Sequence, residues 1–210
     1  FIRGFFNVIK SATTGTGAAL ERLFITGVSP VTMDDVTSGF NIGTNITNDS
    51  WFNDLVGFSE NELREMLEYY KEQGVLQESI DEIVAMMKPN YDNYCFSEDT
   101  LEQCMFNSDM ALYFLKSFVL HHKKPKEIVD PNIRTDFNKL AYLIKLDHGL
   151  GENFSVIKEI AEQGEIITDI VTHFSALEMT DPSNFKSLLF YFGLLSIKGV
   201  DMVGRPILHV

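Results

Sequence analysis

The strongest constraint on the fold of this chain is a helical spacing of apolar residues with defined ends. Between Ser59 and Gly74 the chain opens with Ser-Glu-Asn-Glu, the pattern of a capping box, and closes with a glycine. Leu63, Leu67 and Tyr70 follow the i, i+4, i+7 spacing in between, which places them on one stripe of a helix. Such a stripe must be buried against other elements, so the sequence predicts packed helices.

The same spacing predicts further helices along the chain. The first two cover residues 2–12 and a segment from Ile80 that Pro89 ends. The next covers residues 108–121, with Leu112, Leu115, Phe118 and Val119 inward. Three more are predicted at residues 132–146, from Ser155 to Gly164 with Ile157, Ile160 and Ala161, and from Asp181-Pro182. Residues 165–174 fit a strand or a helix. Residues 194–197 and 206–210 are predicted as the arms of a β-hairpin.

A different pattern near the start predicts a small α/β part. Leu23, Phe24 and Ile25 have the character of a buried strand, and small polar residues and Pro30 follow at once. A parallel strand ends in this way when its tip faces a ligand crevice. The predicted fold class is therefore mostly α, with an α/β remnant over residues 1–56. A helical part covers residues 57–210, and it is winged-helix-like over about 154–210 with a β-hairpin at its end.

Composition restricts the partners of the chain. Its 210 residues carry a net charge of −13, which repels nucleic-acid phosphates unless a local basic patch overrides it. No run reaches the ~18 apolar residues that a membrane span needs, so no transmembrane helix is predicted. Cys95 and Cys104 make neither a disulfide framework nor a zinc site, and they fit a reducing cytoplasm, the predicted location.

Three polar or aromatic groups have two interpretations each. Asp34 and Asp35 could hold Mg²⁺, but they fit better in the first turn of a short helix. The aromatic turn at residues 91–96 could line a pocket, and packing against the core is favoured. The basic cluster at residues 121–126 could touch nucleic acid, while capping of a helix C-terminus is the favoured interpretation.

Several motifs together resemble those of a bacterial family of AAA-ATPase-like proteins. They are FITGVSPV from Phe24, TSGFN from Thr37, GFSE from Gly57, YDNYCF from Tyr91 and LLFYFGLL from Leu188. The resemblance implies that the chain is the C-terminal part of the ATPase region, made of its last sheet strand and a helical, winged-helix-like lid. It also implies a phosphate-binding loop and a Mg²⁺-binding strand upstream, and a restriction-endonuclease-like domain downstream.

The resemblance also gives candidate site residues. Thr26 and Ser29 would occupy a sensor-like position, where a hydroxyl can bond the γ-phosphate of ATP or its attacking water. Capping of the strand turn by Thr26 is an equal alternative. Arg22 and Arg134 are candidate phosphate contacts, with a surface ion pair as the alternative role for each. No metal ligand is predicted.

The expected function is thus the lid and sensor portion of an ATPase-like protein. ATP and Mg²⁺ would be bound by the parent protein, and this chain alone is expected to bind no cofactor and to lack ATPase activity. The expected partners are the upstream ATPase half and the downstream nuclease-like domain, with self-association possible through an exposed strand edge at residues 23–28. The alternative is an interaction module, for which the acidic charge favours a protein partner over nucleic acid.

Overall fold

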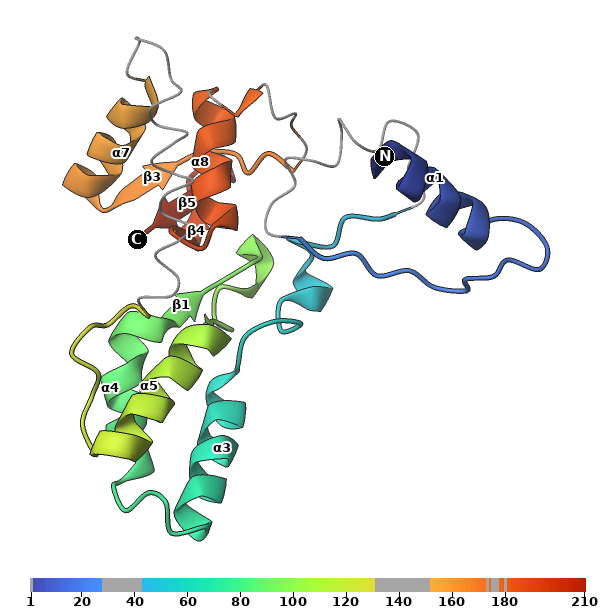
Figure 1. Cartoon of the computed structure of the whole chain (residues 1–210). Coiled ribbons are helices and arrows are strands. Elements are labelled where there is room, and N and C mark those ends of the chain that lie inside the picture. The colour runs from blue at the N-terminus through green and yellow to red at the C-terminus, as the bar shows by residue number, and fades with distance from the viewer. Residues whose placement is uncertain (1, 28–42, 131–151, 173, 175–177, 180) are drawn as a thin grey trace. The chain divides into compact units, whose positions relative to one another are not determined.

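The computed structural model of the chain is mostly helical, as the sequence predicts (Figure 1). It describes residues 2–27, 43–130, 152–172, 174, 178–179 and 181–210. Six α-helices lie in these ranges: α1 (Ile2–Thr13), α3 (Glu60–Glu72), α4 (Ile80–Tyr91), α5 (Ser108–His121), α7 (Glu152–Gln163) and α8 (Pro182–Tyr191). Within the same ranges, no helix has the length and apolar character needed to cross a membrane.

The strands are short and form two small sheets. β1 (Asp92–Tyr94) pairs antiparallel with β2 (Met105–Phe106). β3 (Glu165–Ile167), β4 (Ser196–Val200) and β5 (Pro206–His209) form a sheet in which β5 lies in the middle. Two 3₁₀-helices complete the described elements, η2 (Ser50–Phe52) and η3 (Glu98–Thr100).

The chain divides into two compact units. Unit 1 contains residues 1–46, 142–195 and 208–210, and unit 2 contains residues 47–141 and 196–207. Helices α1, α7 and α8 therefore belong to unit 1, whereas α3, α4 and α5 belong to unit 2. The domain boundary that the sequence suggests near residue 57 stays a prediction.

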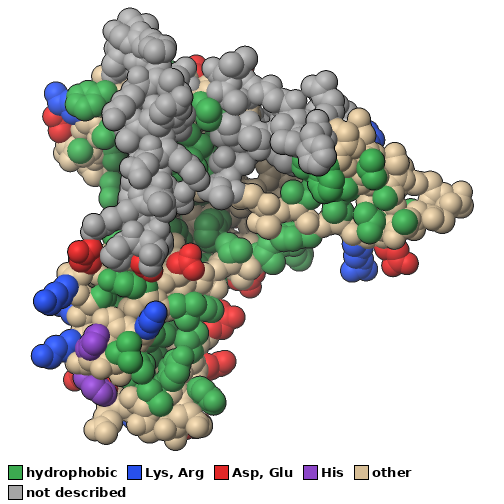
Figure 2. Space-filling model, in the orientation of Figure 1, with side chains coloured by type: hydrophobic (Ala, Val, Ile, Leu, Met, Phe, Trp, Pro, Cys, Tyr) green, Lys and Arg blue, Asp and Glu red, His purple; other side chains and the backbone are tan. Residues whose placement is uncertain are grey.

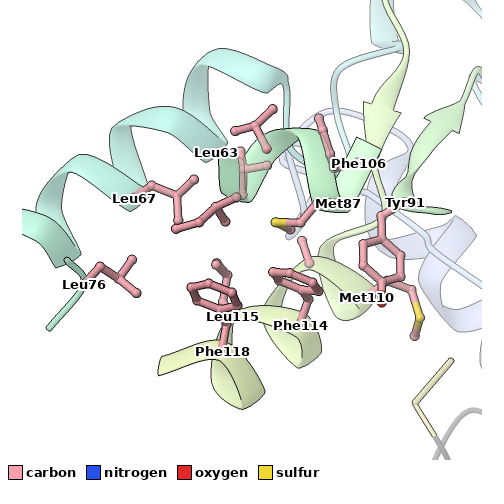
Figure 3. Close-up of a cluster of buried hydrophobic side chains, with 13 residues drawn as sticks. Leu63, Leu67, Leu76, Met87, Tyr91, Phe106, Met110, Phe114, Leu115 and Phe118 are labelled. Atoms are coloured by element: carbon pink, nitrogen blue, oxygen red, sulfur yellow. The ribbon is translucent and has the colours of Figure 1, made fainter. Parts of the chain in front are cut away.

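The core of unit 2 is a cluster of apolar side chains from α3, α4 and α5 (Figure 3). Figure 3 shows Leu67 of α3 facing Leu115 and Phe118 of α5. The rings of Phe114 and Phe118 stack with their centroids 5.6 Å apart. The buried members of the cluster are Leu63, Leu67, Leu76, Ile83, Val84, Met87, Tyr91, Phe106, Met110, Ala111, Phe114, Leu115 and Phe118.

The ends of α3 confirm the predicted capping signals. The backbone N–H of Glu62 donates to the hydroxyl of Ser59, and the Glu62 carboxylate accepts from the backbone N–H of Ser59. This capping box satisfies donors that the first turn of a helix leaves free. Gly74 follows the helix with φ of 71°, the left-handed conformation that glycine adopts without strain.

Two details of α4 and α5 correct the sequence predictions. Helix α4 does not end at Pro89 but continues to Tyr91. Pro89 lies in the last turn and removes one intrahelical bond, and the two further residues place Tyr91 in the core. In α5, Leu112 was predicted to point inward but is 46% exposed, because the buried face follows Ala111, Phe114, Leu115 and Phe118 instead.

The C-terminal part contains two of the predicted helices and the predicted hairpin. Asp181 caps α8 by accepting from the backbone N–H of Ser183, and Phe185, Leu188 and Leu189 of this helix are buried. The hairpin is confirmed, with its first arm at Ser196–Val200. The ambiguous segment begins as strand β3. Helix α7 begins at Glu152 and not at Ser155, and its buried side chains are Asn153, Val156 and Ile160.

The predicted strand at residues 23–25 is not formed. Leu23, Phe24 and Ile25 have no regular secondary structure, and they are 40%, 67% and 40% exposed. A strand requires a neighbour for its backbone groups, and no strand in the described ranges pairs with this segment. The assignment of residues 1–56 to an α/β remnant stays a prediction. The predicted helix at residues 132–146 and the residues Asp34 and Asp35 lie outside the described residues.

We expect Phe114→Ala to lower the free energy of unfolding by about 3–5 kcal/mol, because the ring is 2% exposed and its loss leaves a cavity. The matched control is Leu112→Ala on the same helix, which should cost less than about 1 kcal/mol since nearly half of that residue's surface is already in water. Urea denaturation followed by circular dichroism measures both. Equal losses would contradict the observed burial pattern of α5.

Candidate functional site

The residues predicted to sense a phosphate are not brought together in the described part of the chain. Thr26 and Arg22 lie in an irregular segment, and both are exposed. No hydrogen bond or ion pair among the described residues joins them. Ser29 and Arg134 lie outside the described residues. The sensor-like role of Thr26 and the phosphate contacts of the arginines therefore stay predictions.

A shallow depression of about 780 Å³ lies within unit 2. Its walls come from the start of α3, the end of α4, and the segment that leads into β2. It is lined by Asp54, Ser59, Glu60, Asn61, Lys88, Pro89, Asp92, Glu102, Gln103, Cys104 and Met105. Four carboxylates and one ammonium group thus share this surface, which favours a cationic ligand over a phosphate.

The cation of the depression, Lys88, is held by two carboxylates. Its Nζ lies 2.7 Å from Oε2 of Glu60 and 3.8 Å from Oδ2 of Asp92. Arg64 contacts the other oxygen of Glu60 at 2.9 Å and reaches Asp81 at 2.7 Å. The hydrogen bonds from Lys88 and Arg64 lower the pKa of Glu60, and the bond to Glu60 raises the pKa of Lys88. Lys88 is therefore a charged, paired group and not a free base.

Burial gives two other groups of the depression unusual proton affinities. It raises the pKa of Asp92, and the nearby Lys88 offsets part of this effect. Burial also raises the pKa of the Cys104 thiol, whose Sγ lies 3.6 Å from the carbonyl oxygen of Leu101. A thiol with a raised pKa is a poor nucleophile at neutral pH. Cys104 is therefore poorly suited to act as a nucleophile.

A buried asparagine, Asn53, organises the surface beside the depression. Its side chain accepts from the backbone N–H of Phe96 at 3.2 Å and donates to the carbonyl oxygen of Gln103 at 2.9 Å. Asn53 is 2% exposed, so both bonds are shielded from water. It thereby ties η2 to the aromatic turn. Sequence reasoning missed this residue, because a lone Asn in a polar loop carries no local signal of a tertiary role.

The aromatic turn packs against the core, as the favoured interpretation predicted. Tyr91 is 3% exposed, and its hydroxyl donates to the carbonyl oxygen of Ile128. Cys95 is also buried, and its backbone N–H donates to the hydroxyl of Ser196 at 2.9 Å. Tyr91 and Cys95 thus fix the turn from two sides, by packing and by hydrogen bonds.

The basic cluster of residues 121–126 begins at the C-terminal end of α5, and His122 caps the helix there. Figure 2 shows histidine and lysine side chains gathered in this region. His122 adopts φ of 50°, and its backbone N–H donates to the carbonyl oxygen of Phe118. Its Nδ1 lies 3.0 Å from Oε1 of Glu78. These contacts support the predicted capping role.

The loop of the β4–β5 hairpin is fixed by one carboxylate. Asp201 accepts from the backbone N–H groups of Val203 and Arg205, each at 2.9 Å, and from the guanidinium of Arg205. These bonds, led by the backbone N–H of Arg205, lower the pKa of Asp201. Met202 and Val203 at the tip are 106% and 75% exposed. The loop is therefore ordered by its own hydrogen bonds while its apolar side chains face water.

No group of three His, Cys, Asp or Glu side chains within the described ranges is placed to hold a metal ion. Comparisons of the chain with family models, with curated proteins and with solved structures find no match.

Replacing Asp92 with Asn should stabilise the fold at pH 7. Burial is the largest cause of the raised pKa of Asp92, so ionising it costs folding free energy above that pKa. As the pH falls through the raised pKa toward the ordinary value of 3.8, the advantage of the Asn variant should shrink. Urea denaturation at several pH values measures this difference.

The matched control is Asp54→Asn, an exposed carboxylate at the same depression. It should leave the free energy of unfolding nearly unchanged at each pH, because water already solvates this group. A lower stability of the Asp92→Asn variant at pH 7 would instead mean that the attraction of Asp92 to Lys88 outweighs its burial.

Proposed function

We propose that this chain is the lid and sensor portion of an AAA-ATPase-like protein and does not catalyse ATP hydrolysis alone. The observation that carries the proposal is the order of its C-terminal elements. Helix α7 is followed by β3, helix α8 by β4 and β5, and the last strand lies between the other two. This strand order, with the last strand in the middle, is the one that a winged helix has, and α7 and α8 would supply two of its three helices. Such a module is what the sequence motifs imply for the lid.

The ionisable groups of unit 2 support a non-catalytic role for this part. Lys88 and Arg64 are both engaged by carboxylates, so neither is a ready partner for a phosphate. Cys104 holds its proton more tightly than an ordinary thiol. In the proposal, the groups that cradle ATP and Mg²⁺ belong to an upstream ATPase half, and a nuclease-like domain lies downstream. Thr26 and Ser29 would sense the γ-phosphate in that assembly, and Arg22 and Arg134 would contact phosphate.

The proposal predicts how substitutions of Thr26 change the rate of ATP hydrolysis. The protein to be tested is the product of the longest reading frame that contains this chain. Thr26→Val removes the hydroxyl at nearly constant volume and should lower kcat for ATP about 10²-fold, as loss of one transition-state hydrogen bond does. Thr26→Ser keeps the hydroxyl and should retain most activity. A phosphate-release assay measures both variants.

The control is Thr14→Val, which removes a hydroxyl that donates to the carbonyl oxygen of Lys10 at the end of α1. It should leave kcat unchanged. Equal activity of the Thr26→Val and Thr26→Ser variants would remove the sensor role. If the 210-residue chain alone hydrolysed ATP and Thr26→Val abolished that activity, the proposal that this chain does not catalyse ATP hydrolysis alone would be contradicted.

An interaction module is the second candidate function, and the hairpin tip favours it. Met202 and Val203 expose apolar surface on an ordered loop, which suits a protein contact. Helix α8 occupies the position of a recognition helix in the winged-helix order, yet Phe185, Leu188 and Leu189 bury it, and Lys186 is its one cation. These features favour a protein partner over nucleic acid.

A DNA-binding measurement separates these alternatives. We expect no binding of a duplex of mixed sequence at about 50 mM salt, because the net charge of −13 repels the phosphates. Fluorescence anisotropy of labelled DNA over a series of salt concentrations is the assay. Binding that weakens steeply with salt, and that is lost in a Lys186→Glu variant, would establish the nucleic-acid alternative instead.

A further inference from the structure

The two cysteines of the chain lie at the loop end of the β1–β2 ladder in unit 2. Tyr94 faces Met105 in the last pair of this antiparallel ladder. Cys95 is the next residue along the first strand, and Cys104 is the preceding residue along the second. The two cysteines therefore face each other where the ladder would continue. Both are free thiols in this structure.

The side chains of the two cysteines are turned toward the same loop. The Cys95 thiol donates to the carbonyl oxygen of Ser97 at 2.9 Å, and Sγ of Cys104 lies 3.6 Å from the carbonyl oxygen of Leu101. Both carbonyl groups belong to residues 96–103, the loop between the two strands. Burial is the largest cause of the raised pKa of the Cys104 thiol, and the nearby Cys95 thiol raises it further. The two sulfur atoms thus lie in one local environment.

Facing positions of an antiparallel pair match the distance that a disulfide requires. Their Cα atoms lie about 4.5 Å or about 5.5 Å apart, depending on the position in the ladder. A disulfide joins Cα atoms that are roughly 4.4–6.8 Å apart. A bond between Cys95 and Cys104 therefore needs no rearrangement of the two strands.

The two thiols differ in their access to solvent. Cys95 is 1% exposed, whereas Cys104 is partly exposed and lines the depression of unit 2. A small reagent therefore reaches Cys104 first, and Cys95 can act only as the second thiol. The walls of the depression carry four carboxylates and one ammonium group, so they attract a reagent with positive charge.

We propose that Cys95 and Cys104 are a redox pair, which a small cationic disulfide oxidises to an intramolecular disulfide by way of the depression. The inference does not depend on the proposed lid function, since it uses no residue of the C-terminal elements that carry that proposal. In a reducing cytoplasm, the location that the sequence predicts, the pair stays as two thiols until an oxidant appears.

The oxidation consists of two thiol–disulfide exchanges. Cys104 loses its proton, and its sulfur attacks one sulfur of the reagent RSSR. A bond forms between this cysteine and one RS group, while the other RS group leaves and takes up a proton. Cys95 then loses its proton, and its sulfur attacks Sγ of Cys104 and displaces the second RS group, which is also protonated. Two cysteines are thus oxidised to one disulfide, and the reagent is reduced to two thiols.

The bond forms slowly and fixes the loop of residues 96–103. Because burial raises the pKa of both thiols, few of them are thiolates at neutral pH, and uncatalysed exchange takes minutes to hours. The loop contains η3, which packs on η2, and it supplies the two backbone groups to which Asn53 is bonded. A disulfide at its base therefore clamps the segment on which η2 rests.

Mass spectrometry of the 210-residue chain tests the pairing. The native chain is treated with cystamine, a dicationic disulfide, at mildly alkaline pH, and the reaction is quenched with acid at intervals. We expect a monomeric product that has lost two hydrogen atoms, that yields one linked pair of peptides containing Cys95 and Cys104, and that a dithiol reductant restores.

Single variants separate the two thiols. Cys95→Ser should stop at a mixed disulfide on Cys104. Cys104→Ser should react at least about 10-fold more slowly than Cys95→Ser, because its remaining thiol is buried. Circular dichroism checks that both variants keep their helices. If Cys104→Ser reacts as fast as Cys95→Ser, the entry of the reagent through the depression is wrong.

The charge of the reagent tests the role of the depression. Each oxidation rate of the native chain is divided by the rate for the urea-unfolded chain. On this scale cystamine should react faster than the anionic oxidised glutathione, and added salt should reduce the difference. Glu102→Gln, at the depression, should weaken the preference for cystamine. The matched control is Glu98→Gln, which removes the same charge from the loop outside the depression and should weaken the preference less. Equal normalised rates for the two reagents would remove the cationic selectivity.

Urea denaturation tests the clamp. Oxidation should move the unfolding midpoint to higher urea concentration, because a disulfide restricts the unfolded chain. Cys95→Ser treated in the same way is the control and should show no such shift. A lower midpoint for the oxidised chain would mean that the bond strains the loop. A chain that stays fully reduced, or that forms only linked dimers or separate adducts on both cysteines, would overturn the pairing itself.

Discussion

Burial of the facing apolar stripes of α3, α4 and α5 is the interaction on which unit 2 depends. At roughly 25 cal/mol per Å² of buried apolar surface, side chains such as Phe106 and Phe114 provide the driving force that fixes these helices. The connecting segments are then anchored to that core. The backbone N–H of Phe58 donates to the carbonyl oxygen of Phe106 at 2.9 Å, and Tyr91 joins α4 to Ile128. The depression and the exposed apolar residues of segment 51–56 both lie on segments held in this way.

Local signals in the sequence predicted the helices well, because caps and apolar stripes act within one element. Ser59 with Glu62 and Asp181 with Pro182 begin helices where expected. Prediction failed where tertiary contacts determine which face of a helix is buried and where the helix ends. The buried face of α5 is rotated away from Leu112. Pro89 lies inside α4 because the helix continues to Tyr91, whose side chain is buried in the core. The segment at residues 23–25 has strand composition, but composition cannot supply a pairing partner.

The candidate site was less predictable than the fold. Glu60 and Lys88 are 28 residues apart, and their ion pair depends on how α3 packs on α4. Asn53 bonds a residue 43 positions later, so its role follows from the fold and not from its neighbours in sequence. The residues that the family resemblance suggested, Thr26 and Arg22, are exposed, and no described contact assembles them into a site.

The two apolar protrusions of unit 2 share one local device. Asp49 accepts from the backbone N–H of Trp51, and Asp201 accepts from that of Val203, so in each case a carboxylate fixes the turn two residues before an exposed apolar side chain. Such an Asx turn orders the backbone without covering the side chain. Binding then costs less backbone conformational entropy, because the turn is already ordered. Exposure alone would fit a mobile loop, whereas exposure on a carboxylate-fixed turn is what a preorganised contact requires.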